Sequence, residues 1–219
     1  VEAGSEEASL YASLEGVAAV FPVLAVAAPE PESSLSPEMF TAVAMTGADI
    51  AQSELGLSGE GVKVAIIDTG IDYDHPDLGG TGTDGDLSFP TDRVVAGWDF
   101  VGDAYNADPN SPSYNPVPAP DADPDDCQGH GTHVAGIVGA DGEVDGVAPN
   151  VQFGAYRVFG CEGSTDTQII LDALERAEAD GMDVVNMSLG YAFMTWPDYP
   201  TGVASNILVD NGVVVVGSA

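Results

Sequence analysis

Basic residues are scarce in this sequence. Lys and Arg together number 4 against 36 Asp and Glu, which gives a formal net charge of −32 over 219 residues. Such a surface repels the phosphates of nucleic acids and anionic lipid head groups, so we expect neither as a partner. Self-repulsion of this size destabilises a compact chain unless salt or bound cations screen it. The composition therefore favours a high-salt or calcium-bearing environment, with a merely solubilising surface as the alternative.

Long apolar segments are also missing. The longest, Val17 to Ala28, is interrupted by Pro22 and is too short to cross a bilayer, so we expect no membrane span in this sequence. No secretory signal is visible, but the first residue is Val1 rather than Met, and we expect the natural amino terminus to lie upstream. Hydrophobic residues still make up 44% of the chain, enough for a sizeable core.

Strand-like and helix-like segments alternate from about Gly47 onward. Strands are predicted at Val62–Ile67, Val94–Phe100, Val151–Phe159, Asp183–Leu189 and Val213–Val216. Helices are predicted at His130–Ala140, from Thr165 to Gly181, and at Thr201–Asn211. The long acidic segment from Gly79 to Gln128 is predicted to be mostly loop. This alternation predicts an α/β fold, a doubly wound parallel sheet with helices on both faces.

Two residues have the chemistry of a catalytic pair. Asp68 directly follows the first apolar strand, where active groups gather in such sheets. A buried carboxylate is costly without a partner, and a histidine is a natural one. His130, at the start of the next predicted helix, can act as a general base held by that carboxylate. Taken alone, Asp68 could equally be a turn residue before Gly70, and His133 is better explained as a packed helix residue.

No serine in the sequence has the setting of a nucleophile. Ser188 lies within a strand pattern, and Ser218 ends a strand two residues before the sequence stops. Both are better explained as backbone or pocket-lining groups. We therefore expect a nucleophile, if there is one, to lie outside this sequence.

Four segments in the right order resemble the subtilase family of serine peptidases. They are IIDTGID around Asp68, GHGTHVAG around His130, VVNMSLG and GVVVVGSA. The likeness covers Gly61 to Ala219. It implies an incomplete subtilisin-like fold and a serine endopeptidase in which Asp68 orients His130 and His130 is the general base. The family's oxyanion asparagine would follow Ala219 and its serine would come later, so the sequence as given is expected to be inactive.

The same resemblance implies binding residues for a protein or peptide substrate. It places Ser188, Leu189 and Gly190 in the pocket for the residue before the cut. It implies that Gly163 and Ser164 offer backbone to an extended substrate strand. No cofactor is expected for the chemistry. A structural calcium is expected from the resemblance of Asp77, in DHPDL, to a calcium position in some relatives; a solvated loop carboxylate is the alternative.

The segment before Pro29 resembles the end of the inhibitory prodomain of these enzymes. GVAAVFPV is similar to its closing strand, and a helix ending near Gly16 is predicted before a strand at Val17–Pro22. We thus expect a prodomain tail, of an α+β unit, over residues 1–28, and a linker with the maturation site over 29–46, extended and exposed across 29–37. Residues 47–219 are then the start of the catalytic domain. An unrelated extension is the alternative.

The two cysteines are expected to form a disulfide. Cys127 lies three residues before His130, and Cys161 follows the strand predicted to end near that histidine. Some relatives carry a bridge at matching positions, which fits a secreted protein. Two free buried thiols are the alternative.

Three other functions are weighed against the peptidase prediction. DTG also marks aspartic peptidases, but that predicts an all-β fold and leaves HGTHVAG unexplained. His130, His133, Asp125 and Asp126 could bind zinc, although the histidine spacing and the lack of a Glu between them are unusual for a zinc hydrolase. A non-enzymatic subtilase-like binding module is the third.

Overall fold

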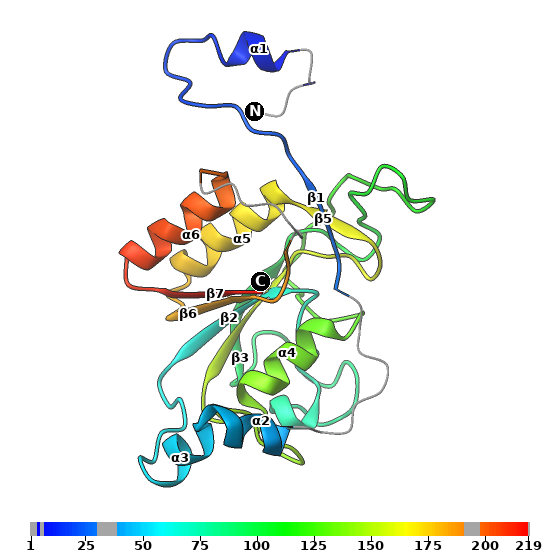
Figure 1. The fold of residues 1–219 in the computed structure, drawn as a ribbon. Helices are drawn as coiled ribbons and strands as arrows, with labels where there is room; N and C mark the ends of the chain where they lie inside the picture. Colours follow the sequence, from blue (N-terminus) through cyan, green and yellow to red (C-terminus); the bar gives the residue numbers. More distant parts are fainter. Residues whose placement is uncertain (1–3, 5–6, 30–38, 191–197, 219) are drawn as a thin grey trace.

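The centre of the molecule is a parallel sheet of five strands with helices on both faces (Figure 1). The computed structural model describes residue 4 and residues 7–29, 39–190 and 198–218. The strand order is β3-β4-β2-β6-β7, every neighbouring pair being parallel. The strands are β2 (Lys63–Asp68), β3 (Val94–Asp99), β4 (Gln152–Arg157), β6 (Val184–Met187) and β7 (Val214–Gly217). The predicted doubly wound α/β fold is confirmed.

The helices divide between the two faces of this sheet. Helices α5 (Thr167–Ala179) and α6 (Pro200–Asp210) cover one face, and α4 (His130–Gly139) covers the other (Figure 1). The remaining helices are α1 (Ala8–Tyr11), α2 (Met39–Thr46), α3 (Ala48–Ser53) and the 3-10 turn η1 (Pro76–Leu78). None of the helices in the described part of the chain has the length and apolar character needed to span a membrane.

Strand β2 shows why both faces are covered. Successive side chains of a strand point to opposite faces. Ala65 and Ile67 accordingly lie in the core beneath α5, whereas Val64 and Ile66 lie in the core beneath α4. A central parallel strand buried on both sides needs the continuous apolar run that the sequence has here.

The predicted strands and helices from β2 onward are present with ends shifted by one or two residues, whereas the strand predicted near the N-terminus was wrong. Helix α5 begins at Thr167 rather than Thr165, because Asp166 is its N-cap, accepting the backbone N–H groups of Gln168 and Ile169. No strand forms at Val17–Pro22. A strand needs a partner, and among the described residues the N-terminal segment pairs with another strand at β1 (Ala25–Ala27) alone.

Strand β1 forms a separate two-stranded antiparallel sheet with β5 (Ser164–Asp166). The N-terminal segment thus crosses the end of the sheet beside the start of α5 (Figure 1). The second part of the predicted 29–46 linker is helical, since α2 occupies Met39–Thr46. The stretch predicted to be extended, 29–37, lies outside the described residues apart from Pro29.

Candidate active site

Asp68 and His130 meet at the carboxyl end of the central strand. Asp68 is the last residue of β2 and is fully buried, and His130 is the first residue of α4, with 15% of its side chain exposed. The distance from Asp68 Oδ1 to His130 Nδ1 is 2.8 Å. The structure therefore brings together the two residues that the sequence analysis paired.

The first turn of α4 can reach β2 only because Gly131 has no side chain. A Cβ at this position would lie 2.2 Å from the carbonyl oxygen of Gly70. The backbone N–H of Gly131 also donates to Thr69 Oγ1 at 2.9 Å. The glycine after the histidine thus allows the close approach that the pair requires.

Asp126 also holds the first turn of α4, through residues just before and just after His130. Its Oδ1 accepts the backbone N–H groups of Gln128 and Gly129, and its Oδ2 accepts the N–H and the hydroxyl of Thr132. Gln128 Oε1 in turn accepts the N–H of His130. Side chains of Thr69, Asp126 and Gln128 therefore anchor the backbone on both sides of His130, and this positions its imidazole.

The environment of Asp68 sets its proton affinity. Burial raises the pKa of this carboxyl group, whereas hydrogen bonds from His130 and from the backbone N–H of Thr69 act in the opposite direction. Both bonds go to Oδ1; Oδ2 is buried and has no hydrogen-bond partner among the described residues. A carboxylate of this kind orients a histidine through Nδ1 and leaves Nε2 as the basic nitrogen.

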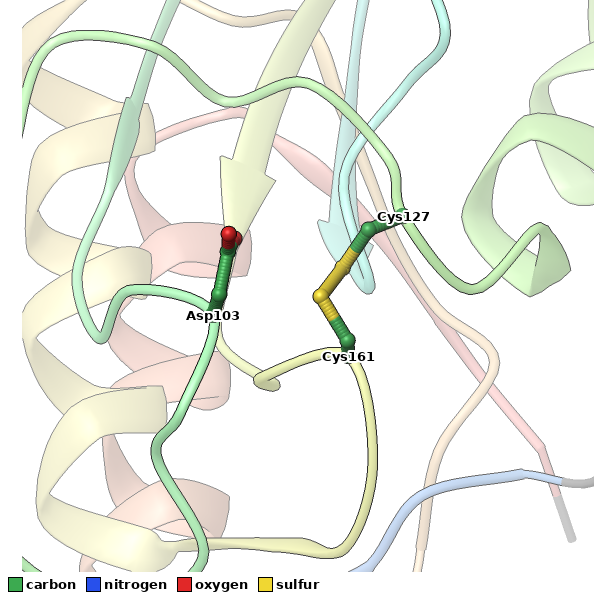
Figure 2. A group of neighbouring side chains, drawn as sticks. All are labelled: Asp103, Cys127 and Cys161. Atoms are coloured by element: carbon green, nitrogen blue, oxygen red, sulfur yellow. A yellow bond between two sulfur atoms is a disulfide. The ribbon is translucent and has the colours of Figure 1, made fainter.

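The residues of the alternative zinc site, His130, His133, Asp125 and Asp126, are not among the metal-ligating groups that come together in the described part of the chain. Within the described residues, the one group of three metal-ligating side chains that come within reach of each other is Asp103 with Cys127 and Cys161. The two sulfur atoms are bonded to each other at 2.03 Å, as Figure 2 shows, so the predicted disulfide is confirmed. It joins the loop before His130 to the loop after β4.

Asp77, the residue at which a structural calcium was expected, is bonded to the backbone of a neighbouring turn. Its carboxylate accepts the backbone N–H groups of Glu143 and Val144, and a Cβ on Gly142 would lie 2.2 Å from Asp77 Oδ1. The carboxylate therefore closes the turn that follows α4, and a structural calcium at Asp77 stays a prediction.

The predicted substrate-binding residues lie at the same end of the sheet. Gly163 and Ser164 face the N-terminal segment: the carbonyl of Gly163 accepts the N–H of Ala28 at 2.9 Å, and Ser164 pairs with Ala27. Ser188, Leu189 and Gly190 directly follow β6, where Ser188 Oγ accepts from the Asn186 side chain. A cavity of about 310 Å³ is lined by Leu189 and Gly190, together with Val26, Ile170, Met187 and others.

Sequence reasoning missed two groups near this site. One is Arg157, which ends β4 and makes ion pairs with Asp99 and Asp103 beside the disulfide. The other is the pair of hydroxyls of Thr167 and Tyr199, which contact the N-terminal segment. Opposite charges at the ends of adjacent predicted strands could have indicated the first; nothing in the sequence pattern indicated the second.

A buried Asp–His pair at the carboxyl edge of a parallel sheet is the arrangement that a histidine general base requires. A family model described as the subtilase family matches residues 59–219. The chain therefore belongs to the subtilase family.

Several curated proteins are similar in sequence. The minor extracellular protease Vpr of Bacillus subtilis is 40% identical over 188 residues, covering 85% of this chain and 21% of that protein. Subtilisin DY of Bacillus licheniformis is 37% identical over 178 residues, covering 78% of this chain and 51% of that protein. Alkaline serine exoprotease A of Vibrio alginolyticus is 38% identical over 134 residues, covering 60% of this chain and 19% of that protein. The chain thus spans between about a fifth and a half of these relatives.

Proposed function

We propose that this chain is part of a secreted serine endopeptidase that hydrolyses peptide bonds in proteins or peptides. The observation that carries the proposal is the 2.8 Å hydrogen bond between His130 and the fully buried Asp68. Membership of the subtilase family and the protease names of the relatives support it. Secretion is supported by the disulfide and by the word extracellular in the name of one relative.

In the proposed mechanism His130 moves the proton and Asp68 keeps the imidazole in place. With its Nδ1–H directed to Asp68, His130 can take a proton at Nε2 from a serine hydroxyl as that oxygen attacks the substrate carbonyl, and later give it to the leaving amine. Asp68 stabilises the imidazolium without itself becoming protonated. The serine is supplied by a part of the protein outside this sequence, so residues 1–219 alone are inactive.

The proposal extends to the N-terminal segment and to the substrate cleft. Residues 1–28 are the end of an inhibitory prodomain, and β1 lies along β5 as a substrate strand would. Gly163 and Ser164 then bind the substrate backbone, and Ser188, Leu189 and Gly190 line the pocket for the residue before the cut. The antiparallel register of β1 against β5 supports this arrangement, because backbone pairing binds extended chains of many sequences.

The test is replacement of Asp68 by Asn in the full-length protein. Turnover of a peptide substrate should fall by about 10⁴, because an amide favours the wrong imidazole tautomer. The exposed Asp49, changed to Asn, is the matched control and should leave turnover unchanged. Circular dichroism confirms that both variants fold. Near wild-type turnover in Asp68→Asn would refute the assigned roles, and failure of the wild type to react with a serine-directed fluorophosphonate would favour the non-enzymatic binding module.

A further inference from the structure

The hydrogen-bond ladder on β5 does not stop where the strand stops. We propose that the side-chain hydroxyls of Thr167 and Tyr199 extend it and bind the backbone of a polypeptide substrate further upstream. This inference rests on the proposed function, in which β1 occupies the place of a substrate strand. It assigns to α5 and α6 a distal binding site for extended polypeptides.

Register explains why a side chain is needed at Thr167. The pairing of β1 with β5, continued by one residue, places Leu24 opposite Thr167, whose backbone N–H donates to the carbonyl of Leu24 at 3.1 Å. Because Thr167 is the first residue of α5, its own carbonyl belongs to the helix and cannot accept from a strand. Thr167 Oγ1 takes over that function and accepts the N–H of Leu24 at 3.2 Å.

Tyr199 continues the ladder two residues further along the N-terminal segment, at Pro22. Its hydroxyl donates to the carbonyl of Pro22 at 2.7 Å and lies 2.8 Å from Thr167 Oγ1. Since the single phenolic hydrogen goes to Pro22, Thr167 must donate to Tyr199. The bonds therefore run in one direction from the N–H of Leu24 through both hydroxyls to the carbonyl of Pro22, an order in which each bond strengthens the next.

Both hydroxyl-bearing residues are held firmly. With the N-terminal segment in place, Thr167 and Tyr199 are each 8% exposed. They stand at the N-terminal ends of α5 and α6, which pack against each other. The rings of Tyr199 and Phe21, a residue of the N-terminal segment, also pack in a T shape, with centroids 5.9 Å apart and an interplanar angle of 80°. The packing of these two helix starts, rather than the burial that the N-terminal segment adds, favours a site that is formed before its ligand arrives, so that little ordering entropy is lost on binding.

The contacts define the class of ligand. Hydrogen bonds to Leu24 and Pro22 involve only backbone groups, which every extended peptide offers. Leu24 and Val26, two positions apart and so on the same side of the segment, both line the cavity of about 310 Å³ beside Ile170. The expected ligand is an extended segment that reaches at least from Pro22 to Ala28 in length and has apolar side chains at alternate positions.

The experiment compares two labelled peptides taken from this chain, PVLAVAA (residues 22–28) and AVAA (residues 25–28). Their binding to the full-length protein is measured by fluorescence anisotropy after the chain has been cleaved between residues 30 and 38 and the N-terminal segment removed. PVLAVAA should bind more tightly. Tyr199→Phe and Thr167→Val should each weaken PVLAVAA by about five-fold, the effect of one neutral hydrogen bond, and leave AVAA unchanged.

Ser205→Ala is the matched control. Ser205 lines the same cavity, but its hydroxyl donates to the carbonyl of Thr201, so both peptides should bind as before. Equal binding of the two peptides, or an equal loss for both in the Tyr199 and Thr167 variants, would overturn the inference. Hydrolysis of a separate short fluorogenic substrate tests the proposed function. If the fluorogenic substrate is not hydrolysed but PVLAVAA still binds more tightly than AVAA, only the enzymatic proposal is lost.

Discussion

Replacement of Arg157 by Met in the full-length protein should lower its free energy of unfolding by about 3–5 kcal/mol. Arg157 Nη1 lies 3.2 Å from Asp99 Oδ2, and the two side chains are only 4% and 2% exposed. Removal of the guanidinium therefore leaves a buried carboxylate without its cation. Methionine fills a similar volume, so the loss reports the missing charge rather than a cavity.

Two details narrow this magnitude. Asp99 Oδ1 accepts the backbone N–H groups of Val101 and Gly102 at 2.8 Å, so the orphaned carboxylate keeps two bonds and the loss should lie near the lower limit. The second ion pair of Arg157, to Asp103, adds less than about 1 kcal/mol because 76% of the Asp103 side chain is exposed.

The loss should also depend on pH. Burial raises the pKa of Asp99, and the Arg157 charge is one of the effects that oppose this rise. Without Arg157 the folded-state pKa of Asp99 rises further, so the variant is least stable above that pKa and recovers as acid protonates the carboxyl group. The difference from wild type should therefore shrink as the pH falls.

Equilibrium unfolding in urea, followed by circular dichroism, measures these differences. Arg157→Met combined with Asp99→Asn should be more stable than the sum of the single variants predicts, because the second change removes the uncompensated charge. Arg176→Met is the control: Arg176 is 42% exposed, and its i,i+4 pair with Asp180 should contribute about 1 kcal/mol or less. If Arg157→Met costs no more than the control, the buried pair does not stabilise the fold as argued.

Three further changes test other parts of the structure. Replacement of both Cys127 and Cys161 by Ser should cost about 4 kcal/mol of unfolding free energy in the chain-entropy model, given their separation of 34 residues, and reductant should have the same effect on the wild type in urea. Burial and neighbouring carboxylates raise the pKa of Asp125 to about 6. The stability it contributes is complete below its unfolded pKa of about 4 and is lost as the pH rises through 6. Asp125→Asn should therefore reduce the change of melting temperature between pH 4 and pH 6, whereas Glu60→Gln, at an exposed position, should not. The same change of melting temperature with pH in both variants would contradict this. Gly131→Ala should cost about 1–3 kcal/mol of unfolding free energy and displace His130, and an unchanged melting temperature would show that the close approach is not needed.

The sequence was informative wherever a local pattern determines the structure. β2 and β4 are apolar segments bounded by turn residues, and their strands form where predicted. Asp68 and His130 could be paired because the carboxyl ends of parallel strands share one edge of the sheet. Their contact depends on which elements they belong to, and a shift of one or two residues in an element end does not change that.

Local patterns did not predict the elements that form by pairing with a distant part of the chain. β1 and β5 have only three residues each, and they exist because they pair across a long stretch of chain. The bond from Leu24 to Thr167 joins residues 143 positions apart. The strand predicted at Val17–Pro22 is absent: the sequence there is equally apolar, but no described strand pairs with it. Pairing, rather than propensity, selects among such segments.

The scarcity of basic residues has a structural counterpart in how carboxylates are satisfied. Asp74, Asp99, Asp126 and Asp166 each accept at least two backbone N–H groups in loops or at helix starts. Such bonds are short and partly shielded, so salt weakens them little, whereas it strongly screens repulsion between exposed carboxylates. A protein stabilised by surface ion pairs loses those contacts as salt rises. Here the backbone replaces the missing cations, so salt relieves the repulsion of a −32 chain without weakening the main contacts of its acidic loops.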